Sequence, residues 1–159
     1  MFKIGDKIFY PNHGAGVIHS IEEKEFLGEK HLYYVLNMLL KGLQIMVPVE
    51  KMSNLGIRLV VKLDTLDNVL AMFNEEEPDL TINSTQRHRI NLDKLKRGDI
   101  YEGAEVIRDL VCIGKKKVLG AGDKMMLDSA REILLSELAL VKGIEKEQAS
   151  LLLYEAINN

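Results

Sequence analysis

The sequence lacks the residues and the long apolar runs on which several classes of protein depend. It has no tryptophan and one cysteine, Cys112, which excludes an internal disulfide and a cysteine-cluster metal site. No run approaches the roughly 18 apolar residues of a membrane-spanning helix, and the N-terminus lacks the apolar core of a signal peptide. We therefore expect a cytoplasmic protein in which Cys112 is a small, buried residue of a helix.

Motifs of catalysis and of ligand binding are missing as well. The four histidines lie in different predicted elements, without the spacing of a metal site: His13, His19, His31 and His88. The segment Gly120-Ala121-Gly122 precedes a predicted helix, but it lacks the Lys-Ser/Thr pair of a nucleotide-binding loop. No acid–base pair is evident in register, so we expect neither an enzyme nor a bound cofactor.

The composition is that of a folded protein with an uneven distribution of charge. Of the 159 residues, 47% are hydrophobic, which suits one compact domain or two small ones. The formal net charge is −3, which argues against a general nucleic-acid coat. Between Ser84 and Lys124, however, ten Lys or Arg outnumber six Asp or Glu. Such a patch can assist DNA binding, although a solvated helix face accounts for the same pattern.

The first 61 residues have the pattern of a small β domain. Short runs of β-branched and aromatic residues predict strands at 7–10, 17–21, 32–38, 44–49 and near 57–60. Turn-forming residues separate these runs, and Pro48 is expected at a strand end or a sheet edge. Short strands at this close spacing predict a strongly bent sheet or a barrel.

The pattern changes to helices after Val61. A first helix with Asp64 as its N-cap is interrupted by the acidic run Glu75-Glu76-Glu77 and Pro78. Further helices are predicted from Ser84 to Gly98, from about Tyr101 to the run Lys115-Lys116-Lys117, from Gly120 to Gly143, and from about 146 to 156. In the helix from Gly120 to Gly143, Asp123 would complete a weak capping box. The sequence therefore predicts an α+β protein: a β domain followed by a bundle of about five helices.

Several segments together resemble one known family. Tyr10-Pro11-Asn12-His13-Gly14, preceded by Phe2-Lys3-Ile4-Gly5-Asp6, is similar to the N-terminal module of the CarD/CdnL family, which also occurs in transcription-repair coupling factor. The match extends through Val47-Pro48 and Arg58, and Glu105-Val106-Ile107-Arg108-Asp109-Leu110 resembles the signature of the family's second half. The resemblance covers nearly the whole chain.

The resemblance implies a function and two partners. Residues 1–61 would form a Tudor-like or SH3-like domain that docks on the β subunit of bacterial RNA polymerase, where an exposed sheet edge can pair with a partner strand. Residues 62–159 would form a helical domain that contacts promoter DNA near the upstream edge of the transcription bubble. Such a transcription regulator modulates open-complex stability, binds no membrane and is nucleoid-associated through the polymerase.

The residues carried over by the resemblance depart from the family at three positions. The two arginines of the polymerase contact fall on Lys24, which keeps the charge without the guanidinium fork, and on Met46, which can only pack. Many members wedge a tryptophan into the DNA minor groove where this chain has Ser84. A serine suits a helix N-cap better than a wedge.

DNA contact would then rest on basic residues: Arg87, Arg89, Lys115, Lys116, Lys117 and Lys124. Arg108 is instead expected to pair with Asp109 inside the domain. A stand-alone protein–protein adaptor with little or no DNA binding is the alternative. The sequence also leaves open whether the chain is a monomer or a domain-swapped dimer, because the predicted strand edges are not protected by charge.

Overall fold

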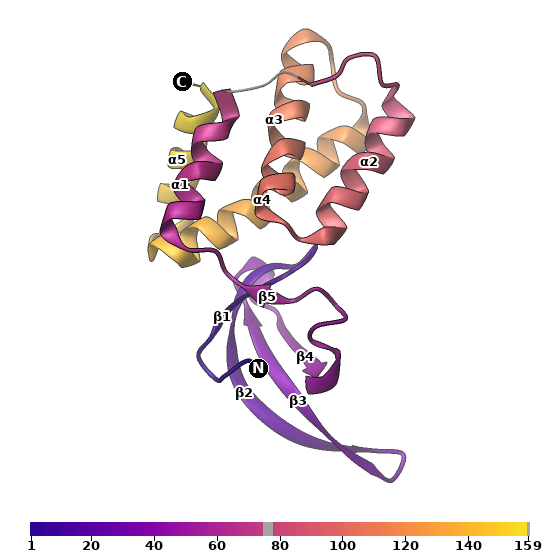
Figure 1. Ribbon diagram of the computed structural model, residues 1–159, viewed down its shortest axis with the longest axis vertical. Coiled ribbons are helices and arrows are strands. Elements are labelled where there is room, and N and C mark those ends of the chain that lie inside the picture. Colours follow the sequence, from indigo (N-terminus) through magenta and orange to yellow (C-terminus); the bar gives the residue numbers. More distant parts are fainter. Residues whose placement is uncertain (75–77, 159) are drawn as a thin grey trace.

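The computed structural model describes residues 1–74 and 78–158 and has two parts (Figure 1). A five-stranded antiparallel sheet comes first in the chain, and five α-helices follow it. The α+β prediction is therefore confirmed. The predicted helix break at Glu75-Glu76-Glu77 lies outside the described residues.

The sheet is open, with the strand order β4-β3-β2-β1-β5. Of the two predicted shapes, a bent sheet or a barrel, the bent sheet is the one observed in the described residues. Its strands are β1 Lys7–Tyr10, β2 Gly14–Phe26, β3 Glu29–Met38, β4 Gln44–Pro48 and β5 Arg58–Leu59. Pro48 ends the edge strand β4 as predicted, where its missing N–H costs no sheet hydrogen bond.

Strand β2 is much longer than the predicted strand at 17–21. It begins earlier because the glycines that predict a turn instead let two strands approach closely. A Cβ atom at Gly16 would lie 2.7 Å from the backbone oxygen of Asn37 on β3. At its other end β2 continues to the two-residue turn Leu27-Gly28, whose φ angles of 51° and 81° suit the right-handed twist of a hairpin.

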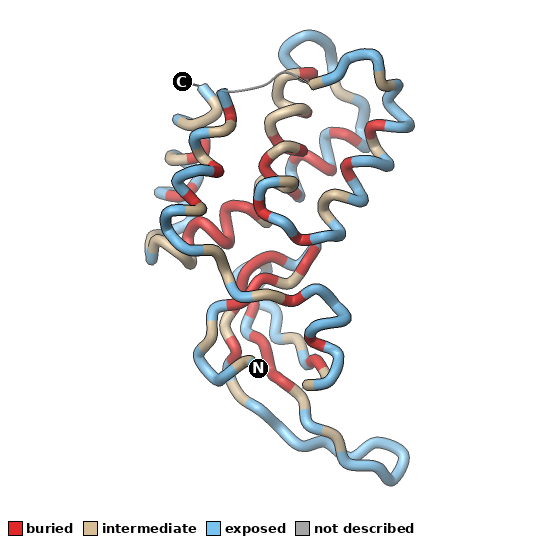
Figure 2. Tube along the Cα trace, viewed as in Figure 1, coloured by how far each residue is buried: buried red, intermediate tan, exposed pale blue. Residues whose placement is uncertain are grey.

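The β2–β3 hairpin divides into a packed base and an exposed arm. At the base, Ile18 and Leu36 are almost completely buried and pack with Ile8 of β1. Beyond residue 20 the hairpin curves away from the helices, and residues 21–30 are all exposed (Figure 2). The arm therefore presents both of its faces to solvent.

The five α-helices and several of their ends follow the prediction. They are α1 Leu63–Ala71, α2 Ser84–Arg97, α3 Ile100–Lys116, α4 Ala121–Lys142 and α5 Lys146–Asn158. Gly98 and Gly143 adopt the left-handed conformation that ends a helix, and Gly120 is the N-cap of α4, all as predicted.

Three predicted caps are wrong. Lys62, not Asp64, is the N-cap residue of α1. Asn83 caps α2 in place of Ser84, because its side-chain oxygen accepts a 2.9 Å hydrogen bond from the Gln86 N–H. Asp123 is 8% exposed and bonds to a side chain of α2, so it does not close a capping box at Gly120.

The helices enclose a second core, separate from that of the sheet. Leu66 of α1, Ile107 and Leu110 of α3 and Leu138 of α4 are completely buried in it. Cys112 lies in α3 as predicted, but it is only partly buried. Each part of the chain thus has its own core, and polar contacts join the two parts.

A buried carboxylate on α4 joins the helices to the sheet. Glu137 is 1% exposed, and its two oxygens accept hydrogen bonds of 2.8 and 2.9 Å from the Arg58 guanidinium on β5. The Val61 N–H donates a third bond of 2.9 Å to the same carboxylate. Three charge-assisted bonds compensate the desolvation of this charge.

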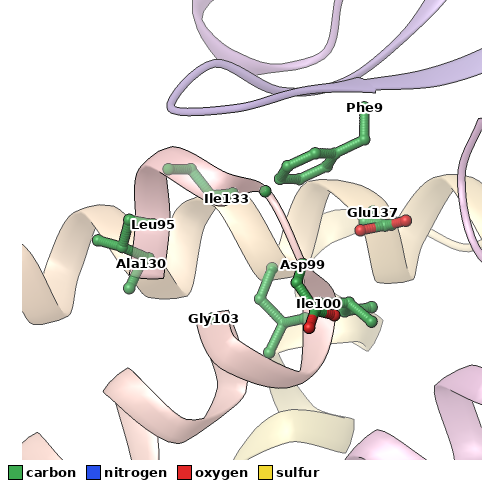
Figure 3. A pocket seen from close by; sticks show the side chains of 10 residues that line it. Phe9, Leu95, Asp99, Ile100, Gly103, Ala130, Ile133 and Glu137 are labelled. Carbon is green, nitrogen blue, oxygen red and sulfur yellow. The ribbon is translucent and has the colours of Figure 1, made fainter. Parts of the chain in front are cut away.

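Further contacts hold Arg58 in place at this junction. Its Nε donates a 2.9 Å bond to the Gly98 carbonyl, and its guanidinium carbon lies 4.3 Å from the ring centre of Phe9. Figure 3 shows Phe9 reaching from the sheet toward the helices, beside a hollow that Glu137 also lines. Nearby, the Ala15 N–H donates to the Ser136 hydroxyl at 2.9 Å.

We predict that Glu137→Ala lowers the free energy of unfolding by about 3 kcal/mol, because it leaves Arg58 without its counter-charge. Urea denaturation followed by circular dichroism measures the change. Glu132→Ala, on an exposed part of the same helix, is the matched control and should leave the midpoint nearly unchanged. The double variant Arg58→Met/Glu137→Leu should recover most of the loss. A wild-type midpoint for Glu137→Ala would contradict this account.

Candidate functional site

The two predicted polymerase-binding residues lie on one face of the sheet. Lys24 on β2 stands opposite His31 on β3, and Met46 on β4 stands opposite Val35 on β3. Residues paired across two strands lie on the same face of a sheet, and so do residues four apart in one strand, as His31 and Val35 are on β3. Lys24 and Met46 therefore project to the same side. Met46 is 42% exposed. We call this side of the β2–β3–β4 sheet the outer face.

Phe26 belongs to the outer face too, and the sequence prediction missed it. It is the last residue of β2, two positions after Lys24, and 66% of it is exposed. It lies between the predicted strands at 17–21 and 32–38, where the sequence pattern does not define the direction of a side chain. Only the continuation of β2 to the turn assigns Phe26 to the side that carries Lys24.

The outer face ends at an unpaired strand edge. In the part of the chain that the structure describes, β4 has a neighbouring strand on one side only, β3. The residues of β4 carry no charge, so nothing on the strand repels an incoming segment. An extended partner segment could add to this edge through backbone hydrogen bonds.

The exposed basic residues lie at the other end of the molecule. The N-terminus of α2, the C-terminus of α3 and the N-terminus of α4 meet at the end of the helical part that is farthest from the sheet (Figure 1). His88 of α2 links two of them, since its Nδ1 lies 3.8 Å from the Asp123 carboxylate of α4. We call this end the basic end; its exposed cations are Arg89, Lys115, Lys116, Lys117 and Lys124.

Arg87 does not share this exposed position, although the resemblance groups it with the others. It is 9% exposed, and its Nη2 lies 3.2 Å from the Asp123 carboxylate. It faces inward because it stands one helical turn before Asn91, which is also buried. Arg87 therefore ties α2 to α4, whereas a phosphate contact requires an exposed guanidinium. Ser84 is exposed in the first turn of α2, beside the capping Asn83.

Ion pairs within the chain neutralise three other cations of the segment from Ser84 to Lys124. Lys94 pairs with Glu105, Arg97 with Glu102 and Arg108 with Asp109, so the predicted Arg108–Asp109 pair is confirmed. The hydrogen bonds from Arg97 lower the pKa of the Glu102 carboxyl. With the Arg87–Asp123 pair, these ion pairs engage four of the six carboxylates in the segment from Ser84 to Lys124. The local excess of positive charge therefore falls on the exposed residues.

Comparison with known proteins defines the class to which this arrangement belongs. Residues 2–61 match the model of the CarD-like/TRCF RID domain, an RNA polymerase-interacting domain, and residues 68–154 match the model of the CarD C-terminal domain. The chain is thus a CarD-like transcription factor with a polymerase-interacting domain, and it belongs to the CarD family. Among residues 1–74 and 78–158, no helix is long and apolar enough to cross a membrane.

Among individual relatives, the chain is 48% identical to the "putative transcription factor YdeB" of Bacillus subtilis (strain 168). That match extends over 148 residues, 93% of this chain and 97% of the relative. The solution structure of the N-terminal domain of Myxococcus xanthus CarD is 30% identical and matches 37% of this chain and 79% of its own, with a TM-score of 0.32. CdnLNt of Myxococcus xanthus is 39% identical and matches 38% of this chain and 86% of its own chain, with a TM-score of 0.33.

We predict different effects on stability for two arginines of α2. Arg87→Ala should lower the free energy of unfolding by about 2 kcal/mol, because it leaves the Asp123 carboxylate buried without its partner. Arg89→Ala removes the same side chain from an exposed position and should leave stability unchanged. Thermal and urea unfolding of the two variants measure the difference. Equal stability of the two variants would contradict the internal role of Arg87.

Proposed function

We propose that the outer face docks on the β subunit of RNA polymerase and that the basic end then contacts promoter DNA near the upstream edge of the transcription bubble. Bound in this way, the protein modulates the stability of the open complex. The observation that carries the proposal is the arrangement of two unlike surfaces at opposite ends of one molecule. The outer face combines exposed apolar residues with one lysine and two carboxylates, Glu22 and Glu29, and the basic end is cationic.

The composition of the outer face suits a protein partner. Phe26 and Met46 supply exposed apolar surface, and such residues are enriched at the centres of protein interfaces. Lys24 supplies a single cation, held 3.6 Å from the Glu22 carboxylate at an exposed position, where the pair is weak and a partner's carboxylate can replace Glu22. The unpaired edge of β4 adds backbone donors and acceptors.

The composition of the basic end suits the phosphate backbone of DNA. Its lysines are point charges on flexible side chains, which attract phosphates without reading bases. Ser84 cannot open a base step as a large apolar side chain does. Binding to free DNA should therefore be weak and independent of sequence, and docking on the polymerase would raise the local concentration of DNA around these lysines.

One observation favours the adaptor function with little or no DNA binding. Ser84 stands where many family members have the tryptophan wedge, and the Arg87 side chain is buried. Two of the seven residues inferred for DNA contact therefore contribute little to DNA binding. In that function the outer face would bind its partner and the basic end would be a solvated surface. Titration of DNA at several salt concentrations separates the two functions.

We predict that Lys24→Glu weakens binding of the full chain to the isolated β lobe of the polymerase by at least tenfold, because it places a second acid beside Glu22 on the outer face. Lys30→Glu is the matched control: Lys30 lies on the same hairpin but on the opposite face, and it should bind as the wild type does. Isothermal titration calorimetry measures both affinities. No binding of the folded wild-type chain to the lobe would refute the docking proposal.

We predict that affinity for a forked promoter duplex falls as salt rises, and that each lysine removed from the basic end lowers the slope of log K against log salt by about 0.9. Lys115→Gln and Lys124→Gln should do so equally for unrelated DNA sequences. Fluorescence anisotropy between low and physiological salt gives the slopes. Binding that is independent of salt, or absent even at low salt, would favour the adaptor function instead.

A further inference from the structure

A hollow of about 360 Å³ lies between α3, α4 and α5, and it is lined by none of the residues named above for the outer face and the basic end. Its floor is apolar. Leu135 of α4 and Leu153 of α5 are buried there, and the partly buried Val111 of α3 and Ile157 of α5 complete it. The volume falls within the range of small-molecule sites, which are mostly apolar with a few polar groups.

The rim of this hollow carries one cation, Arg131 of α4. Four of the six arginines, including Arg58 and Arg87, pair with carboxylates, and Arg89 is exposed at the basic end. Arg131 is partly buried, yet it forms no ion pair or hydrogen bond with any residue in the described part of the chain. Its neighbour Glu132 is engaged elsewhere, 2.7 Å from Lys146.

The opposite rim belongs to α5 and is polar without charge. Ser150, Tyr154 and Asn158 lie four residues apart in turn, so they form one stripe along the helix beside the apolar floor. The Ser150 and Tyr154 hydroxyls can each donate a hydrogen bond. The hollow thus combines a guanidinium, two hydroxyl donors and an apolar floor, and among residues 1–74 and 78–158 no acidic residue lines it.

We propose that this hollow binds an amphiphilic monocarboxylate, a small molecule with an alkyl or aryl body and one carboxylate. The guanidinium fork of Arg131 matches a carboxylate in a bidentate arrangement, and the hydroxyls of α5 can donate to the same group. The body of the ligand would cover Leu135 and Leu153. A free phosphate would leave that apolar floor uncovered, and an alkylamine would be repelled by Arg131. The proposal does not depend on polymerase or DNA binding.

Octanoate tests the proposal with the full chain. Methyl NMR spectra should show saturable shifts for Leu135, Leu153 and Ile157 as octanoate is added, and 1-octanol at equal concentration should shift them at least tenfold more weakly. Arg131→Gln should weaken octanoate binding by at least tenfold, and Arg131→Lys should restore part of it. Arg131 lies on the rim, so these variants should keep the wild-type fold, which circular dichroism verifies.

A matched control removes a cation at the C-terminal end of the same helix. Lys142→Gln, 11 residues from Arg131, should bind octanoate as tightly as the wild type does. The proposal is overturned if octanoate at millimolar concentration leaves the three methyl groups unshifted, if octanol binds as tightly as octanoate, or if Arg131→Gln keeps wild-type affinity. None of these outcomes bears on polymerase docking, which is measured separately.

Discussion

The buried carboxylate of Glu137 is the constraint on which the arrangement of the two parts depends. A carboxylate that is 1% exposed is tolerated only where donors surround it, and here the donors come from Arg58 and Val61 at the end of the β domain. Because the guanidinium fork fits in one orientation, helix α4 can take one position against β5. The sheet and the helices are therefore held in a defined relation, despite their separate cores.

Helix α4 extends this constraint to the basic end. It carries a second buried carboxylate, Asp123, which holds Arg87 of α2. Asp123 and Glu137 are 14 residues apart, about 21 Å along the helix axis. One helix thus connects the sheet at one end with the basic end at the other. In the proposed function, this connection sets where the lysines of the basic end stand once the outer face has docked.

Much of the fold followed from local patterns. The alternation of short strands, the positions of the helices and the endings at Gly98 and Gly143 depend on neighbouring residues, and they were predicted. The length of β2 was not predicted, because Gly16 belongs to β2 through the close approach of the β3 backbone, which leaves no room for a Cβ atom. Phe26 was missed and Arg87 was misplaced for a related reason: the face on which a side chain lies depends on pairing and packing partners that are distant in the chain.

The sequence by itself determined the family, the order of strands before helices and the residue types available for binding, because these follow from motifs and periodicity along the chain. Only the tertiary structure decided which residues act together. It placed Lys24, Phe26 and Met46 on one face, and it turned Arg87 inward. Glu137, a single glutamate in the apolar stretch of α4, indicates that a polar partner must bind it. No local sequence pattern identifies this partner as Arg58, which is 79 residues away. Burial makes an unmatched charge costly, and only the folded chain shows which partner compensates it.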